Sequence, residues 1–245
     1  QAVLARTWAL RNSGRFQVDG YHLCADTQCQ VYGDPGQAGR AVREAIRLTR
    51  HQVLAWNGRP IQAVYHASNG GIAAGFEEAW GGDPQPYLSA FADGPGGFAR
   101  RFAVPLATTP RLSALLAEGA LAYGSDHPRF RWRRHLQAEQ LTVLERGPSG
   151  RVLTLAVQPV GAPRLLLQRD GIRRHFPQLP STLFTVIPEG NGCWRLEGGG
   201  FGHGVGLSQA GALDLARRGW NFRRILGHYY PGAVLQPLES LAGDP

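Results

Sequence analysis

The chain has 245 residues, of which 43% are apolar, and its 26 basic residues against 18 acidic ones give a formal net charge of +8. This length and apolar share suffice to bury a core, which excludes a disordered chain, a collagen and a disulfide-stapled miniprotein. All the basic residues are arginine, since the sequence contains no lysine. Arginine is permanently charged and binds carboxylates and phosphates through paired donors, so this excess favours an acidic partner such as nucleic acid, anionic lipid or an acidic polymer.

The N-terminal quarter predicts two helices and a hairpin. Residues 1–10 carry apolar side chains at helical spacing, and residues 38–50 place Ala41, Ala45 and Leu48 on one side with arginines on the other. Two alternating runs, residues 52–56 and 61–66, flank an Asn-Gly turn, which is a strong hairpin signal. The sequence has no methionine and opens within a helical pattern, so we expect a longer translation product with any signal peptide or anchor preceding Gln1.

The rest of the chain predicts an α+β fold, with mixed helices and antiparallel strands in a single domain over residues 1–245. Residues 68–97 form a long Gly/Pro-rich loop with aromatic residues in it, which is typical of a functional segment. Residues 100–180 are expected to form a small inserted α+β subdomain. Its elements are a helix near 110–119 and strands at 141–144, 152–157 and 165–167; later helices are expected at 208–218 and 222–229. No apolar stretch is long enough to span a membrane.

A cluster of arginines lies in the predicted subdomain, at positions 129, 131, 133 and 134 around Phe130 and Trp132. Such a cluster indicates either a solvated basic face or a contact surface for an anionic polymer. A nucleic-acid binder is the weaker interpretation, because no recognised nucleic-acid-binding motif accompanies the charge.

The paired cysteines leave several interpretations open. Cys24 and Cys29 enclose four residues, and His22 lies just before them. A disulfide closes such a loop without further partners and fits an oxidising compartment. Zinc bound by His22, Cys24 and Cys29 is the alternative, but it offers three ligands at an unusual spacing; two inert thiols are the third possibility. We therefore expect no cofactor, with zinc as the minor alternative.

Two segments carry most of the chemical information. Residues 65–71, Tyr-His-Ala-Ser-Asn-Gly-Gly, end a strand in an imidazole and a hydroxyl before two glycines turn the backbone. Residues 198–209 place six glycines around His203, and Ser208 is positioned to cap the following helix. The pattern of a phosphate-binding loop, GxxxxGK[ST] or a GxGxxG with a downstream acid, is absent. Each histidine can therefore be structural or can serve in a cleft.

These same segments carry a family resemblance. Residues 200–212, GFGHGVGLSQAGA, followed by residues 225–232, ILGHYYPG, resemble the C-terminal signature of the stage II sporulation protein D family, which includes the LytB amidase enhancers. Further matches occur in family order at residues 1–10, 29–32, 65–71, 80–82, 86–88 and 179–184. The resemblance runs from residue 1 to about residue 235.

The resemblance implies an extracytoplasmic enzyme of the cell wall. Members of the family act as lytic transglycosylases on peptidoglycan glycan strands stripped of their peptides, and others enhance a partner amidase without cleaving glycan. The family's catalytic acid is a glutamate shortly before the segment matched by residues 1–10, so we expect it upstream of Gln1. Glu77, Glu78 and Glu197 are the carboxylates nearest the motifs, but we do not expect any of them to replace it.

The resemblance also implies a set of substrate-binding residues. Arg6 matches a family position linked to function and is expected to bind the lactyl carboxylate of muramic acid, with a helix-surface role as the alternative. The side chains expected to bind glycan are Arg6, Tyr65, His66, Ser68, Trp80, Tyr87, His203, Ser208 and Gln209. The expected partners are glycan strands and a cell-wall amidase.

Overall fold

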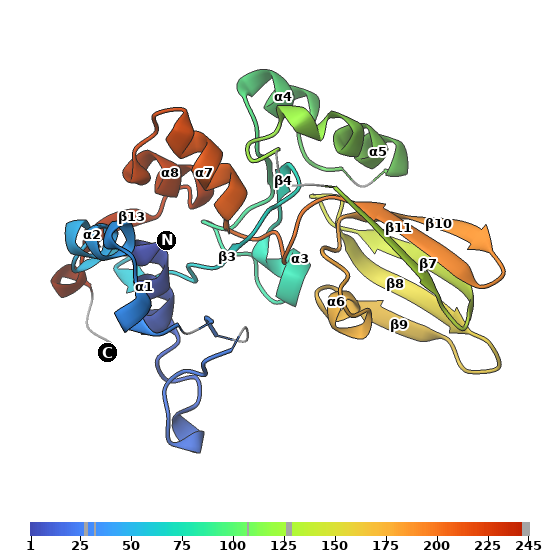
Figure 1. The fold of residues 1–245 in the computed structure, drawn as a ribbon, viewed down its shortest axis with the longest axis horizontal. Coiled ribbons are helices and arrows are strands. Elements are labelled where there is room, and N and C mark those ends of the chain that lie inside the picture. The colour runs from blue at the N-terminus through green and yellow to red at the C-terminus, as the bar shows by residue number, and fades with distance from the viewer. Residues whose placement is uncertain (27–28, 32, 107, 126–128, 242–245) are drawn as a thin grey trace. The chain divides into compact units, whose positions relative to one another are not determined.

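A computed structural model of the chain describes residues 1–26, 29–31, 33–106, 108–125 and 129–241 (Figure 1). The chain divides into two compact units, one formed by Gln1–Val64 with Gly232–Pro245 and the other by Tyr65–Pro231. Both contain helices and antiparallel strands, which confirms the predicted α+β class. No helix of the described residues is long and apolar enough to cross a bilayer.

The first unit packs helix α1 on a three-stranded antiparallel sheet. Val3, Leu4 and Trp8 form the buried face of the helix, at the spacing that the sequence predicts. Thr7 lies on the same face, where its hydroxyl donates to the Val3 carbonyl at 2.8 Å and accepts from the Leu54 amide at 3.0 Å. The elements of this unit are α1 (Ala2–Arg11), α2 (Arg40–Leu48), β1 (Gln52–Trp56), β2 (Arg59–Pro60), β13 (Val234–Pro237) and short 3-10 turns at Gln17–Asp19, Pro35–Gln37 and Leu238–Ser240.

The predicted hairpin is present but shorter than expected. Ala55 pairs with Pro60 across the turn, and Asn57 and Gly58 both have positive φ, as a two-residue hairpin turn requires. Residues 61–64 do not continue the second strand. The other edge of β1 pairs with β13 instead, a partner from the far end of the chain that no local pattern predicts.

Helix α2 forms where it is predicted, but its apolar stripe is not buried. Every residue of the helix is exposed, including Leu48 at 59% exposure. The stripe of Ala41, Ala45 and Leu48 is thus exposed in this structure. Helical periodicity marks which side chains share a face, but burial also requires a surface that covers that face.

The second unit contains the remaining elements. Its helices from 110–119, 208–218 and 222–229 and its strands from 141–144, 152–157 and 165–167 all appear within a few residues of the predicted bounds. The helices are α3 (Phe76–Trp80), α4 (Gly96–Arg101), α5 (Thr109–Glu118), α6 (Gly171–His175), α7 (Gln209–Arg217) and α8 (Phe222–Tyr229), with a 3-10 turn at Gly119–Leu121. The strands are β3 (Tyr65–His66), β4 (Ile72–Ala73), β5 (Phe91–Ala92), β6 (Phe130–His135), β7 (Ala138–Arg146), β8 (Val152–Pro159), β9 (Leu165–Gln168), β10 (Phe184–Gly190), β11 (Cys193–Gly198) and β12 (Leu207–Ser208).

Two three-stranded antiparallel sheets share one core in this unit. Their orders are β10–β11–β6 and β7–β8–β9. Trp132, Leu155, Phe184 and Leu196 from these sheets pack together with Ile172 of α6. A second cluster packs α4 and α5 against the chain near β4, through residues that include Ile72, Phe98, Leu112 and Leu183. The sheets extend beyond the predicted boundary at residue 180, because β6 pairs with β11 along its whole length.

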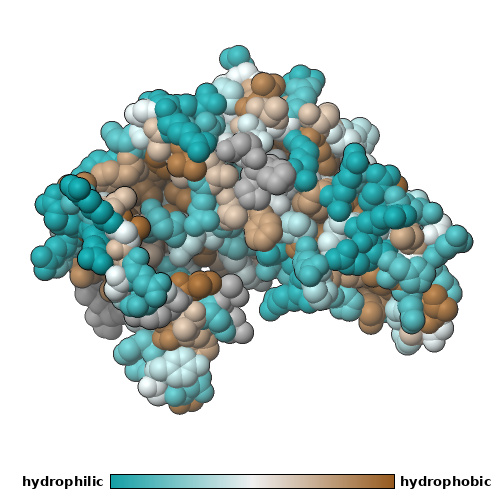
Figure 2. Space-filling model, viewed as in Figure 1, coloured by the Kyte–Doolittle hydropathy of each residue, from teal (hydrophilic) through white to brown (hydrophobic). Residues whose placement is uncertain are grey.

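Three arginines of the cluster lie on β6, and two of them pair with carboxylates. Arg131 contacts Glu197 at 3.1 Å, and Arg133 is bound to Glu189. Arg134 donates to Gln178 instead. Hydrophilic side chains cover this part of the molecule in Figure 2, over the strands labelled β10 and β11 in Figure 1. Exposed ion pairs of this kind are typical of a solvated face, and the cluster keeps an excess of positive charge.

Candidate functional site

The two glycine-containing motifs lie side by side in the second unit. Strand β3 runs parallel to β12, with Tyr65 opposite Leu207 and His66 opposite Ser208. Beyond these strands, Ser68 and Phe201 exchange two backbone hydrogen bonds of 3.1 and 2.8 Å. Segments more than 130 residues apart in the sequence thus form one substructure, which we call the double loop (residues 65–74 and 198–208).

Close backbone approach explains two of the glycines in the double loop. Gly70 has a φ of +71°, and a Cβ there would lie 2.7 Å from the Gly199 carbonyl carbon. Gly204 has a φ of +83°, and a Cβ there would collide with the guanidinium of Arg151. Any larger residue at either position would strain the backbone and force the neighbouring segment away.

A buried arginine is hydrogen-bonded to the backbone of the double loop. Arg151 is 1% exposed and donates to the carbonyls of Asn69 at 2.8 Å and Ile72 at 2.9 Å. Burial lowers the pKa of its guanidinium to about 10, so the group remains charged at neutral pH. The nearby carboxylate of Glu78, 2% exposed, favours that charge and itself accepts from the Ser149 hydroxyl at 2.7 Å.

The two histidines of the double loop are neutral and have defined tautomers. Nδ1 of His203 accepts from the Val205 amide at 3.1 Å, so its Nε2 carries the proton and donates to the Tyr65 carbonyl at 3.1 Å. His66 Nδ1 donates to the Val205 carbonyl at 3.1 Å. Burial lowers the pKa of His203 to about 4, and burial together with His203 holds the pKa of His66 well below its ordinary value.

One nitrogen in the double loop is left without a partner. His66 Nε2 is buried and makes no hydrogen bond with the described residues. Since Nδ1 of this neutral ring carries the proton, Nε2 is an acceptor. Buried acceptors are normally satisfied, so a water molecule or a ligand donor is expected there.

The exposed side of the double loop presents flat apolar surface. Trp80 is 42% exposed, and its ring lies 4.8 Å from the His203 ring, centroid to centroid. Phe201 is 51% exposed. Tyr65 is half-buried, and Gln209 is exposed at the start of α7. Aromatic faces beside polar groups are suited to bind sugar rings, which have both apolar faces and hydroxyl edges.

Four predicted substrate-binding residues are buried within the second unit, His66 at 5% exposure and three others. Ser208 is fully buried, and its hydroxyl caps α7 by accepting from the Gly211 amide at 3.2 Å, as the sequence predicts for a cap. Ser68 is 4% exposed and accepts from the Gly70 amide at 3.3 Å. Tyr87 is 5% exposed, and its hydroxyl donates to Gln85. These three side chains present little surface in this structure, and their contact with substrate stays a prediction.

Arg6 lies in the first unit, where it braces the fold. Its Nη1 donates to the carbonyls of Thr49 and Gln52, each at 2.7 Å, so the guanidinium joins α1 to the start of β1. Burial lowers the pKa of Arg6 somewhat. The side chain remains partly exposed, and its binding of a carboxylate stays a prediction.

The carboxylates near the motifs are already engaged. Both oxygens of Glu78 accept hydrogen bonds, from Gly75 and Ser149. Glu197 pairs with Arg131 and Arg195 on the sheet. Glu77 lies in α3, where its backbone carbonyl accepts from Arg169 Nε at 3.1 Å. That none of these three glutamates serves as the acid stays a prediction.

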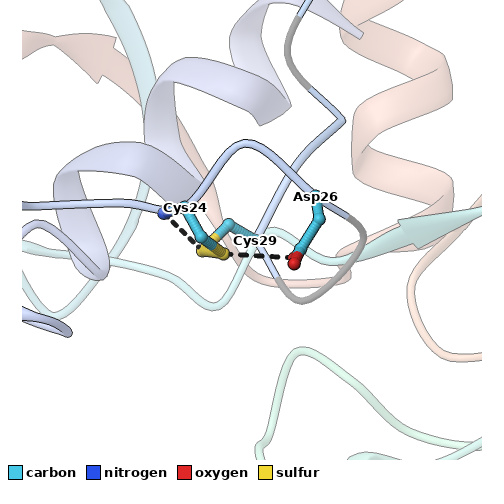
Figure 3. Close-up of a disulfide and its surroundings, with 3 residues drawn as sticks. All are labelled: Cys24, Asp26 and Cys29. Carbon is cyan, nitrogen blue, oxygen red and sulfur yellow. Dashed lines mark hydrogen bonds between the residues drawn. A yellow bond between two sulfur atoms is a disulfide. The ribbon is translucent and has the colours of Figure 1, made fainter.

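Cys24 and Cys29 form a disulfide in the first unit (Figure 3). The Cys24 amide donates to Cys29 Sγ at 3.0 Å, and a carboxylate oxygen of Asp26 lies 3.3 Å from Cys24 Sγ. His22 Nδ1 is hydrogen-bonded to the Ser13 carbonyl instead. Among the described residues, no three His, Cys, Asp or Glu side chains gather as they would around a metal. Tyr32, at the end of the matched segment 29–32, lies outside the described residues.

Sequence reasoning missed one polar network in the second unit. Asp93 follows β5 and is fully buried, yet it is hydrogen-bonded to Asn69, His228 and Tyr229. Three of these four residues belong to segments that carry the family resemblance. No local pattern indicates the role of Asp93, because a single aspartate in a Gly/Pro-rich loop is typical of a turn.

The second unit is thus an α+β assembly in which a buried arginine and two neutral histidines support a glycine-rich double loop. Comparisons with known proteins agree with the resemblance seen in the sequence. Residues 1–56 match the family model described as Stage II sporulation protein. Two overlapping matches, residues 74–142 and 136–206, identify the Domain of unknown function (DUF8618) in the second unit.

Three relatives match almost the whole chain. An uncharacterized protein of Brachyspira hyodysenteriae is 28% identical over 95% of this chain and 59% of its own length. The amidase enhancer of Bacillus subtilis is 24% identical over 96% of this chain and 37% of its own length. The stage II sporulation protein D of Bacillus amyloliquefaciens is 29% identical over 98% of this chain and 68% of its own length. The chain therefore spans between about a third and two thirds of the length of these relatives.

The chain is thus similar to stage II sporulation protein D and to an amidase enhancer, over its first 56 residues by the family model and over nearly its whole length by the relatives.

Proposed function

We propose that this chain is part of an extracytoplasmic cell-wall enzyme that cleaves peptide-stripped glycan strands by a lytic transglycosylase reaction. Similarity to stage II sporulation protein D and to an amidase enhancer supports a role at the cell wall. The observation that carries the proposal is the double loop, whose neutral, fixed histidines and buried arginine support an exposed aromatic surface at Trp80 and Phe201. Aromatic faces beside fixed polar groups suit sugar rings, which have apolar faces and hydroxyl edges.

The reaction needs one carboxyl group that acts first as acid and then as base. The acid protonates the glycosidic oxygen, and the bond between that oxygen and C1 breaks with oxocarbenium character at C1. The muramyl 6-hydroxyl then bonds to C1 and returns its proton to the carboxylate. The products are a 1,6-anhydro-muramyl end and a new hydroxyl end, and no water is consumed.

We propose that a glutamate preceding Gln1 supplies that carboxyl group. Glu78 and Glu197, two carboxylates near the motifs, are held by hydrogen bonds and arginines, and Asp93 accepts from Asn69, His228 and Tyr229. Being neutral at working pH, His66 and His203 would orient the loop and offer hydrogen bonds rather than positive charge. Trp80 would stack on a sugar and hold the strand in register.

The direct test uses the protein extended on its N-terminal side and purified glycan strands without peptides, with the products followed by mass spectrometry. We expect anhydro-muramyl ends, and we expect them to vanish when the upstream glutamate is changed to glutamine. Replacing Trp80 by alanine should raise KM at least tenfold, with Leu213→Ala, an exposed apolar residue of α7, as the control. Reducing ends would instead identify a hydrolase, and intact strands would exclude the enzyme.

One observation favours a second function. A relative that matches 96% of the chain is an amidase enhancer, so the alternative is a non-cleaving module that holds glycan and stimulates a cell-wall amidase. The two functions separate in one experiment. If the variant without the upstream carboxyl group still accelerates an amidase on intact cell walls, enhancement does not depend on cleavage.

A further inference from the structure

A buried carboxylate in the second unit receives three hydrogen bonds. Asp93 Oδ2 accepts from Asn69 Nδ2 at 2.6 Å and from the Tyr229 hydroxyl at 2.9 Å, while Oδ1 accepts from His228 Nε2 at 2.8 Å. Asp93 has no exposed surface. Burial and the charge of Asp93 raise the pKa of Tyr229, which keeps its phenol protonated and donating. The carboxylate therefore has the set of donors that a buried charge requires.

This arrangement orients His228 and leaves its second nitrogen free to bind. The bond to Asp93 assigns the proton to Nε2, as in other carboxylate–imidazole pairs. The side chain is 21% exposed, and Nδ1 makes no hydrogen bond with any residue that the structure describes. The Nε2 bond alone would suffice to hold the ring in place. Nδ1 therefore remains as an acceptor for a hydrogen bond from a partner.

Aromatic rings stand around this imidazole. The Trp220 ring lies 5.7 Å from it at an interplanar angle of 90°, and the Tyr123 ring lies 5.9 Å away at 75°. Both rings are partly exposed. Both rings are roughly perpendicular to the imidazole, so aromatic surface and a polar group lie together, which is the composition of a carbohydrate subsite.

Two exposed arginines complete the surroundings. The Arg224 guanidinium carbon lies 3.7 Å from the Trp220 ring centroid, and the Arg218 guanidinium carbon lies 5.4 Å from that of Tyr123. Arg218 is also paired with Asp214 at 3.1 Å. All of these residues except Tyr123 belong to α7, α8 and the turn between them, and the two helices lie side by side in Figure 1. Tyr123 follows the 3-10 turn at Gly119–Leu121. Stacked guanidinium groups beside aromatic rings suit a ligand with a carboxylate.

We propose that His228, Trp220, Tyr123, Arg218 and Arg224 form a subsite for an acidic saccharide, with Asp93 as the residue that positions His228. The imidazole Nδ1 binds a sugar hydroxyl, the rings contact the sugar face, and the arginines bind the carboxylate. Asn69 links this subsite to the double loop, because its carbonyl is held by Arg151 while its side chain donates to Asp93. The inference rests on the proposed function and assigns it a second contact region.

The test measures binding of two defined probes to the full chain by calorimetry. One probe is a peptide-free tetrasaccharide of alternating N-acetylglucosamine and N-acetylmuramic acid, and the other is chitotetraose, which has no carboxylate. His228→Gln is the informative variant, because the glutamine Nε2 can keep the bond to Asp93 while the Nδ1 position is lost. We expect it to bind the acidic probe at least tenfold more weakly, with an unfolding midpoint close to that of the parent chain.

Charge is tested by a matched pair of substitutions on α8. Arg224 stacks on Trp220, while Arg223 lies over Phe222 on the same helix. We expect Arg224→Gln to remove at least fivefold of the preference for the acidic probe over chitotetraose, and Arg223→Gln to leave it unchanged. Both arginines are exposed, so this pair keeps the test valid even if His228→Gln does not fold.

The outcomes distinguish this inference from the proposed function. Unchanged binding in both His228→Gln and Arg224→Gln would overturn the subsite, while cleavage of glycan strands by the extended protein would still support the enzyme. Failure of the parent chain to bind the acidic probe would also overturn the subsite. Loss of binding in His228→Gln together with normal unfolding supports it.

Discussion

The neutral histidines of the double loop predict that acid weakens the fold over a defined pH range. The pKa of His203 falls from an ordinary 6.5 to about 4. Above pH 6.5 the imidazole is neutral in both the folded and the unfolded chain, so it contributes no pH dependence. Below pH 6.5 the unfolded chain binds a proton that the folded chain does not, so stability falls until the folded pKa is reached near pH 4.

The size of the loss follows from that difference in pKa. One pKa unit corresponds to about 1.4 kcal/mol, which gives a loss of about 2 kcal/mol at pH 5 and about 3 kcal/mol at pH 4 for His203 alone. His66 acts in the same direction, because burial also lowers its pKa. The total therefore forms a large part of the 5–15 kcal/mol that is typical of a folded domain.

The assay is urea unfolding at a series of pH values from 7.5 to 4, on the parent chain and on His203→Gln. The variant lacks the titrating group, so its free energy of unfolding should fall less steeply than that of the parent chain. Between pH 7.5 and pH 4 we expect the variant to lose about 3 kcal/mol less than the parent. His175→Gln, which removes an exposed imidazole on α6, is the control. The reasoning is refuted if the parent and His203→Gln lose stability equally, or if the His203 ring resonances titrate near pH 6.5 in the folded protein.

Three further predictions concern the supports of the fold. Gly204→Ala should lower the free energy of unfolding by about 3 kcal/mol or more in thermal unfolding. Gly219 has a similar positive φ but open space around its Cβ position, so Gly219→Ala should cost about 1–2 kcal/mol. Equal losses in the two variants would show that the contact with Arg151 is unimportant. Arg151→Met should cost about 3–5 kcal/mol and increase amide hydrogen exchange in residues 69–72; unchanged exchange there would contradict its supporting role. Thr7→Val should cost about 1–3 kcal/mol by leaving the buried Leu54 amide unpaired, and a loss below 0.5 kcal/mol would contradict this.

Local patterns predict local elements of this fold well, and the reason is physical. The spacing of apolar residues and the capping of a helix depend on residues that are neighbours in the sequence. The sequence therefore predicts α7, α8 and the Asn57-Gly58 turn. Burial depends on what the rest of the chain brings to a surface. The apolar stripe of α2 is therefore predicted as a stripe, but its exposure is not.

The candidate site divides in the same way. The motifs identify His66 and His203, because glycines around a histidine stand out in a sequence. They do not distinguish the buried Ser68 and Ser208 from the exposed Trp80. No local pattern indicates a role for Arg151 or Asp93, because their partners are remote in the sequence. Arg151 binds a carbonyl 82 residues away, and Asp93 binds a hydroxyl 136 residues away.

The double loop joins residues that are remote along the chain, with 139 positions between His66 and the carbonyl that it binds. Contacts of such high separation form late in folding, because the intervening chain must first lose its freedom. Here the intervening chain includes both three-stranded sheets. We therefore expect the entropy cost of closing the double loop to fall as those sheets form, so that a destabilising change within a sheet also weakens the double loop without touching either motif.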